Sequence, residues 1–259
     1  NPQSPIPNYS FFRLVKTNKI ALNKSPENNL FINMNNNIKE NIKGEIFSVI
    51  FILIIFLLAI PFYKIKPEYS RKEIHIMLGN FYFIALFYFT EWYFACFGPF
   101  VFIFVNYFSI KYQFIKLMLR HEKEKNTFKI KKDYGTVYYA ISLTILTAYS
   151  WKIKKPDFGL CPFLSMAFGD GLACIIGRAI HSPYTIIFGA KKSLSGSLTM
   201  FFVTFILFFV YFWLYNIKYF IFKSFIVGLC SMIMEAFSPY GTDNLTVPLG
   251  NALIMSFLI

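Results

Sequence analysis

From residue 45 onward, long apolar stretches alternate with short polar segments. Stretches of about 16 to 20 residues almost free of charge match the length that a helix needs to cross a hydrocarbon core of ~30 Å. The pattern therefore predicts an all-α fold, a polytopic integral membrane bundle. The predicted spans are 45–63, 74–90, 92–110, 136–151, 158–180, 197–216, 219–237 and 244–259.

The number of crossings is either seven or eight. Only Thr90 and Glu91 separate the second span from the third, and the last span has 16 residues, which is short for a crossing. Residues 1–44 are polar, with scattered prolines and a run of asparagines, so they cannot bury a core. We expect 1–44 to be a disordered leader and 45–259 to be one transmembrane domain.

Composition supports the bilayer as the solvent of this domain. The chain of 259 residues is 56% hydrophobic and 21% aromatic, and its mean hydropathy is +0.49. A water-soluble fold of this size could not bury so many apolar side chains. The four cysteines have no paired spacing, so neither a disulfide framework nor a zinc site is predicted.

The distribution of charge predicts the topology. Lys and Arg number 26 against 13 Asp and Glu, a net charge of +13. If all eight spans cross, 14 basic residues lie in the loops of one face and four in those of the other, the leader excluded. The basic face should then be the cytosolic face or its equivalent. Because the charges lie between apolar spans, we expect them to attract lipid headgroups or phosphates, and we expect no nucleic-acid partner.

Four polar patches fall on this same face. They are RKEIHIMLGN (71–80), FGDGLACIIGR (168–178), KKSLSGS (191–197) and EAFSPYGTDNLTVP (235–248). Hydropathy alone defines the spans, so the location of all four patches on the same face is independent evidence for a site. We expect the site to open toward that face.

Asp170 is a carboxylate inside an apolar span, between Gly169 and Gly171. Such a residue is costly in a bilayer and usually marks a functional cavity. The flanking glycines allow close approach of backbone or ligand, and the carboxylate suits a Mg²⁺ ion bound to a nucleotide triphosphate. The alternative is an acid that packs between helices and pairs with Arg178.

The segment KKSLSGS offers ammonium groups, hydroxyls and a glycine just before the next helix. Lys192, Ser193, Gly196 and Ser197 could wrap a polyphosphate at the helix N-terminus. The glycines do not precede the Lys-Ser pair as in a Walker A loop. Alternatively, the segment is only a basic loop that fixes topology.

Two further pairs could complete a phosphate and metal site. Asp243 and Asn244 could contact a metal or accept a hydroxyl proton, although a turn followed by a helix cap explains them equally well. Arg71 and His75 lie one helical turn apart and could clamp a phosphate. Lys72 lies between them, and the alternative is a snorkelling interfacial pair together with an ordinary histidine.

Taken together, these motifs resemble the phytol, farnesol and polyprenol kinases, a family related to dolichol kinase and more distantly to CTP-using phosphatidate cytidylyltransferases. The matching motifs follow one another in the same order as in the family, over residues 71–249. Its motifs are RKEIH (71–75), GTVYYAISL (135–143), GDGLACIIGR (169–178), KSLSGSLTMF (192–201) and the ending E…DNLTVPL (235–249).

The resemblance implies transfer of the γ-phosphoryl group from a nucleoside triphosphate, typically CTP, to the hydroxyl of an isoprenoid alcohol, with Mg²⁺. It implies Asp170, Lys192 and Asp243 as catalytic residues, with the two aspartates as metal ligands. Nucleotide-binding residues would be Arg71, His75, Gly169, Gly171, Arg178, Ser193, Gly196, Ser197 and Asn244.

The resemblance also places the protein in the endoplasmic reticulum or a plastid-type membrane. Within the same chemistry, dolichol or diacylglycerol as acceptor, or cytidylyl transfer, stays open. A transporter that uses Asp170 and Glu235 along an ion path is the alternative from another class.

Overall fold

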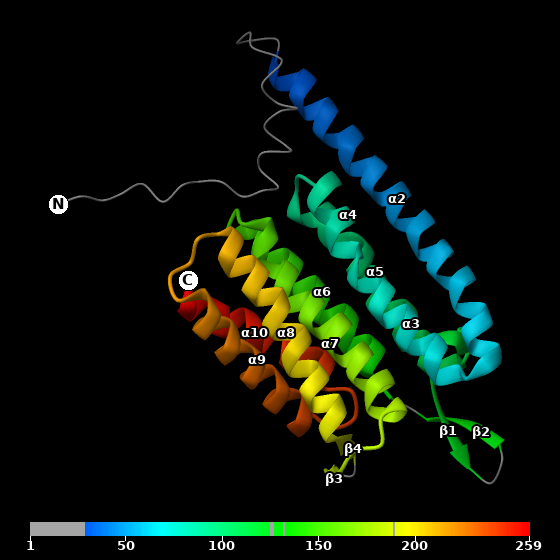
Figure 1. Ribbon diagram of the computed structural model, residues 1–259. Helices are drawn as coiled ribbons and strands as arrows, with labels where there is room; N and C mark the ends of the chain where they lie inside the picture. The colour runs from blue at the N-terminus through cyan, green and yellow to red at the C-terminus, as the bar shows by residue number, and fades with distance from the viewer. Residues whose placement is uncertain (1–28, 125–126, 132, 189) are drawn as a thin grey trace.

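The computed structural model describes residues 29–124, 127–131, 133–188 and 190–259, which form a helical bundle with two hairpins at one end (Figure 1). The helices are α2 (Asn29–Ile65), α3 (Pro67–Gly79), α4 (Phe81–Tyr88), α5 (Trp92–Tyr112), α6 (Gly135–Lys152), α7 (Leu160–Ala179), α8 (Leu194–Leu214), α9 (Phe220–Phe237) and α10 (Asp243–Leu258), with short 3-10 turns η1 (Lys116–Met118) and η2 (Pro156–Gly159). The strands are β1 (Arg120–Glu124), β2 (Thr127–Lys131), β3 (Tyr184–Ile187) and β4 (Ala190–Ser193).

Five helices in the described part are long and apolar enough to cross a membrane. They are Asn36–Ile65, Trp92–Tyr112, Pro156–Ala179, Leu194–Leu214 and Phe220–Phe237. The expectation of a helical membrane protein is therefore confirmed. Helices α6 and α10, with 18 and 16 residues, are not among the five, so a total of seven or eight spans stays a prediction.

Helix α7 is the centre of the bundle. In the most apolar 18 residues of the segment Pro156–Ala179, which contains α7, 72% of the residues are buried inside the protein. The corresponding share for α2 is 17%, because most of its side chains face outward. Small residues let neighbouring helices approach α7 closely. A Cβ added at Gly169 would lie 2.4 Å from Met200 Sδ on α8, and one at Gly171 would lie 2.3 Å from Ile76 Cγ1 on α3. These contacts hold α7 in place between its neighbours.

The region predicted as one span over 74–90 is two helices. Helix α3 begins at Pro67, a residue suited to the first helical turn because it has no N–H to leave unpaired. It ends at Gly79, and Asn80 connects it to the eight-residue α4. The polar RKEIH motif therefore lies in the middle of α3, not at the start of a span.

The start of the membrane domain also differs from the expectation. Helix α2 begins at Asn29, so residues 29–44, expected to be irregular, are helical. Residues 1–28 of the expected leader lie outside the described residues.

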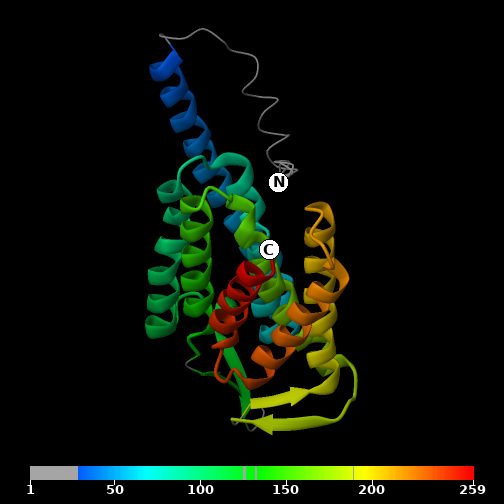
Figure 2. The same ribbon diagram turned by 90° about the vertical axis from the view of Figure 1, so that its left-hand side faces the viewer.

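Two antiparallel hairpins, which an all-α prediction does not contain, connect helices at one end of the bundle. Strand β1 pairs with β2, and β3 pairs with β4, with Thr185 opposite Lys192 and Tyr184 opposite Ser193. Figure 2 shows both hairpins at the same end. The expected phosphate loop 191–197 is thus divided between strand β4 and the first turn of α8.

The connections from α2 to α3, α5 to α6, α7 to α8 and α9 to α10 all lie at this hairpin end (Figures 1 and 2). Residues from all four polar patches line one cavity at this end. The patches are thus grouped at one end of the bundle, and the side of a membrane that this end faces stays a prediction.

Candidate functional site

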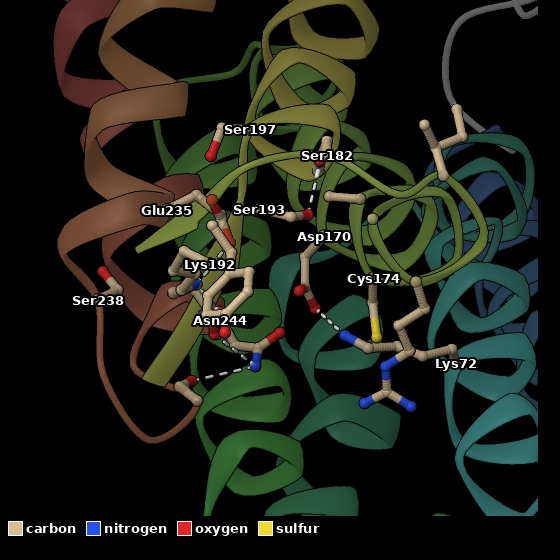
Figure 3. Close-up of a pocket in the computed structure, with 18 of the residues that line it drawn as sticks. Lys72, Asp170, Cys174, Ser182, Lys192, Ser193, Ser197, Glu235, Ser238 and Asn244 are labelled. Atoms are coloured by element: carbon tan, nitrogen blue, oxygen red, sulfur yellow. Dashed lines mark hydrogen bonds and ion pairs between the residues drawn. The ribbon is translucent and has the colours of Figure 1, made fainter. Parts of the chain in front are cut away.

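The hairpin end of the bundle contains a cavity of about 820 Å³ (Figure 3). Helices α3, α7, α8, α9 and α10 and the β3–β4 hairpin contribute its walls. Four basic and four acidic side chains line it, namely Arg71, Lys72, Arg178, Lys192, Asp133, Asp170, Glu235 and Asp243. Charged side chains are thus concentrated in this cavity although the bundle around it is apolar.

The carboxylate of Asp170 on α7 is neutralised by α3. Lys72 Nζ lies 2.6 Å from Asp170 Oδ2, and His75 Nε2 lies 3.3 Å from the same oxygen. Asp170 is only 7% exposed and Lys72 4%, so this is an ion pair inside the protein (Figure 3). The alternative partner named from the sequence, Arg178, is not the one that neutralises Asp170.

Arg178 instead shares a carboxylate with Arg71. The Nη2 atoms of Arg71 and Arg178 lie 3.2 and 3.4 Å from Glu68 Oε2. Glu68 is buried, and it brings the two guanidinium groups to the same edge of the cavity. Two adjacent guanidinium groups are a suitable arrangement for phosphate oxygens.

Lys192 on β4 lies between two carboxylates of the opposite wall. Its Nζ is 2.5 Å from Glu235 Oε1 on α9 and 3.8 Å from Asp243 Oδ2 on α10. Burial alone would lower the pKa of Lys192, but the two carboxylates outweigh it and raise this pKa above its ordinary value. Lys192 is therefore protonated, and its ammonium group is held between the two carboxylates.

Asp243, the first residue of α10, is poorly solvated. Burial and the nearby charge of Asp170 raise the pKa of Asp243 to about 7, although Lys192 acts in the opposite direction. A cation entering the cavity would relieve the repulsion between these two carboxylates.

Two buried acceptor oxygens in the cavity wall have no hydrogen-bond partner among the described residues. They are Glu235 Oε2 and Asn244 Oδ1. The Asn244 amide is held in place because its Nδ2 donates to Gly241 O at 3.0 Å. Buried polar atoms are almost always partnered, so these oxygens indicate a place for a polar ligand or a cation.

The first turn of α8 is held by its own serines. Ser193 Oγ accepts a hydrogen bond from Gly196 N at 3.2 Å and caps the helix. A Cβ at Gly196 would lie 3.0 Å from Ala173 O, so this glycine permits the close crossing of α7 and α8. Ser197 also lines the cavity (Figure 3).

Nine of the twelve site residues predicted from the sequence line this one cavity: Arg71, Asp170, Arg178, Lys192, Ser193, Gly196, Ser197, Asp243 and Asn244. The three that do not are His75, Gly169 and Gly171. Both glycines pack against neighbouring helices, because α7 is in contact with α8 and α3 at these positions. His75 lies beside Asp170 but lines a second, smaller cavity.

Four charged residues in or beside this cavity are absent from the predicted site: Lys72, Asp133 and Glu235, which line it, and Glu68, which contacts Arg71 and Arg178. Asp133 Oδ1 accepts a hydrogen bond from Gly135 N at 2.8 Å and fixes the start of α6. The sequence does contain an indication for Lys72. A buried aspartate requires a cation, and Lys72 lies in the same motif as Arg71 and His75.

Comparison with known proteins identifies relatives of this chain. A phytol kinase from Synechocystis sp. is 35% identical over 127 residues, which are 48% of this chain and 54% of that protein. Phytol kinase 1, chloroplastic, of Arabidopsis thaliana is 26% identical over 208 residues, 73% of this chain and 66% of that protein. Farnesol kinase, chloroplastic, of the same plant is 28% identical over 151 residues, 54% of this chain and 46% of that protein.

The chain thus spans about half to two thirds of the length of these curated relatives. No protein-family model matches it, and no solved structure matches it.

The fold and the cavity define a helical membrane protein with a charged site at one end of an apolar bundle. The chain is a relative of the phytol and farnesol kinases, as its motifs indicated.

Proposed function

We propose that this chain is a membrane-embedded kinase that transfers the γ-phosphoryl group of a nucleoside triphosphate, CTP by preference, to the hydroxyl of an isoprenoid alcohol such as farnesol, geranylgeraniol, phytol or a longer polyprenol. The observation that carries the proposal is the cavity itself. It combines four cationic and four anionic side chains at the end of an apolar bundle, in a relative of lipid-alcohol kinases.

The basic residues suit a triphosphate. Lys72 and Lys192 are each paired with a carboxylate, at 2.6 and 2.5 Å. Phosphate oxygens entering the cavity can replace these carboxylates as partners of the lysines. Arg71 and Arg178, already gathered by Glu68, would hold the outer phosphates in the bidentate manner that guanidinium groups favour.

The released carboxylates suit Mg²⁺. Asp170, Asp243, Glu235 Oε2 and Asn244 Oδ1 provide hard oxygen donors on the cavity wall. The described residues contain no group of three metal-ligating side chains, but Mg²⁺ in kinases needs one or two carboxylates, the rest being phosphate and water. When bound, the ion would neutralise charge that develops on the transferred group.

The reaction requires positioning more than a dedicated nucleophile. The alcohol oxygen attacks the γ-phosphorus, the bond from that phosphorus to the β-bridging oxygen breaks, and the nucleoside diphosphate leaves. The hydroxyl proton passes to a carboxylate of the site, for which Asp170 and Asp243 are the candidates. Lys192 stays protonated and stabilises the phosphates, in agreement with its raised pKa.

The protein would be a multi-pass membrane protein whose cavity faces the cytosol or its equivalent, because the basic loops gather at the hairpin end. The relatives named chloroplastic support a plastid membrane over the endoplasmic reticulum.

Purified protein in detergent tests the proposal, with Mg²⁺ and either CTP or ATP against a panel of farnesol, geranylgeraniol, phytol, dolichol and diacylglycerol. We expect phosphorylation of the isoprenoid alcohols, and its loss in Asp170→Asn and Lys192→Ala. Lys218→Ala, an exposed lysine at the other end of the bundle, is the matched control and should behave as the parent. No phosphorylated alcohol with either nucleotide would overturn the proposal.

A further inference from the structure

A second cavity, of about 20 Å³, lies beside the main site and is separate from it. Helices α3, α5 and α6 form its walls. Arg71 lines both cavities, so the two cavities adjoin at this residue. The cavities also adjoin at a second contact, where His75 Nε2 of the small cavity is 3.3 Å from Asp170 Oδ2 of the large one.

Buried polar atoms without a hydrogen-bond partner line the small cavity. Arg71 Nε and Asn106 Oδ1 are buried and have no hydrogen-bond partner within the described residues, while the contact of His75 Nε2 is the one at 3.3 Å to Asp170 Oδ2. All three residues line this one cavity. Asn106 is 1% exposed although it lies in the membrane-spanning helix α5, where an unpaired polar group is costly.

The amide of Asn106 is held in a fixed orientation. Its Nδ2 donates to Thr136 O at 3.0 Å, which leaves Oδ1 as an unused acceptor. A volume of about 20 Å³ has room for one group of the size of a water molecule. A hydroxyl group has this size and can both donate and accept. It could therefore donate to Asn106 Oδ1 while it accepts from Arg71 Nε.

The remaining wall of the small cavity is apolar. It includes Leu78 on α3 and the half-buried Phe102 on α5. The outer face of α5 exposes Phe100, Phe104 and Phe108, in a helix that is long and apolar enough to cross the bilayer. A lipid alcohol could thus reach the polar end of the cavity past Phe102, with its chain left among apolar side chains.

We propose that this small cavity is the acceptor site, in which Asn106 and Arg71 hold the hydroxyl of the lipid alcohol and Phe102 contacts its first carbons. The inference rests on the proposed kinase function and deepens it. The hydroxyl would lie beside Arg71 and His75, and Asp170, which contacts His75, lines the large cavity that the nucleotide would occupy. The two substrates would thus enter from different phases, one from water and one from the membrane.

Steady-state kinetics of Asn106→Leu test this assignment. We expect the KM for the alcohol to rise about tenfold, as for the loss of one buried hydrogen bond, while the KM for the nucleotide stays at the parent value. If the cavity only holds a structural water, Asn106→Leu will lower the melting temperature and leave both KM values unchanged, which would overturn the inference.

A pair of phenylalanines on the same helix gives a second test that does not depend on the folding of Asn106→Leu. Phe102→Ala should raise the KM for the alcohol, whereas Phe104→Ala, at a position 49% exposed on the outer face, should not. Equal behaviour of the two variants would contradict the acceptor site.

A photoreactive farnesol analogue separates the failure of this inference from the failure of the proposed function. Added to the full chain without nucleotide, it should label peptides of α3 or α5 that line the small cavity, and excess farnesol should suppress the labelling. A parent protein that phosphorylates alcohols but whose Asn106 and Phe102 variants keep the parent KM would overturn the acceptor site alone. A parent that phosphorylates no alcohol would overturn the proposed function.

Discussion

The ammonium group of Lys72 and the carboxylate of Asp170 lie 2.6 Å apart, although 98 residues separate them in the sequence. The pair connects α3 to the central helix α7 at the floor of the charged cavity. Each charge is buried, so each depends on the other. Stability and the proposed nucleotide site are therefore connected through the same two residues.

Lys72→Met removes one half of this pair. It leaves Asp170 without its closest cation, and breaking a buried pair in this way costs ~3–5 kcal/mol. We expect a large fall in melting temperature in detergent and loss of kinase activity. The double variant Lys72→Met/Asp170→Asn should regain most of the stability and none of the activity. Lys64→Met, an exposed lysine at the same end, is the control. A double variant no more stable than the single one would contradict the pair's role.

Glu235→Gln removes the charge that holds Lys192 at 2.5 Å and one of the proposed metal donors. The half-saturating Mg²⁺ concentration should rise about tenfold, since one charged ligand of the ion is lost. Titration of activity with Mg²⁺, after removal of metal by EDTA, measures this change. Glu91→Gln, an exposed glutamate at the opposite end, should titrate as the parent does. An unchanged titration in Glu235→Gln would exclude Glu235 from the metal site.

A second cluster of polar side chains lies at the end of the bundle opposite the cavity. Tyr211 Oη donates to Asp157 Oδ2 at 3.4 Å, and Tyr215 Oη donates to the same buried oxygen. Tyr215→Phe should cost ~1–3 kcal/mol of stability, because a carboxylate loses a donor, while both KM values stay unchanged. Tyr219→Phe, at a position 79% exposed, should not change the melting temperature. A changed KM in Tyr215→Phe would show that this cluster contributes to the site.

Gly196→Ala tests the close crossing of α7 and α8. The new methyl group would lie 3.0 Å from the backbone oxygen of Ala173, which cannot move without displacing α7. We expect a loss of ~1–3 kcal/mol, typical of overpacking, with reduced activity because the cavity wall shifts. Gly98→Ala on α5 meets nothing closer than 3.8 Å and should be neutral or stabilising. Equal melting temperatures for the two variants would contradict the argument.

The sequence predicts the location of the site better than its internal contacts. Hydropathy and charge place Asp170, Lys192 and Asp243 at one end of the bundle, because the alternation of spans determines which loops share a face. The partner of Asp170 is not predictable in the same way. Which of Arg71, Lys72 and His75 faces α7 depends on the rotation of α3, and adjacent helical residues point about 100° apart.

The roles of Gly169 and Gly171 show a second limit. A glycine next to a buried acid is equally compatible with ligand approach and with helix packing, and the structure shows packing against Met200 and Ile76. The β3–β4 hairpin was not predicted either. Its strands have four residues each, too short for a periodic pattern to separate them from a loop.

The central claim is transfer of the terminal phosphoryl group to a lipid alcohol, and the position of a radioactive label tests it most directly. Purified protein is incubated with farnesol, Mg²⁺ and CTP labelled either at the α- or at the γ-phosphorus, and the lipid phase is then extracted and counted. The account predicts that label reaches the lipid from γ-labelled CTP alone, and that Asp170→Asn abolishes it. Label from α-labelled CTP would indicate cytidylyl transfer, and it would contradict the account, as would an unlabelled lipid phase.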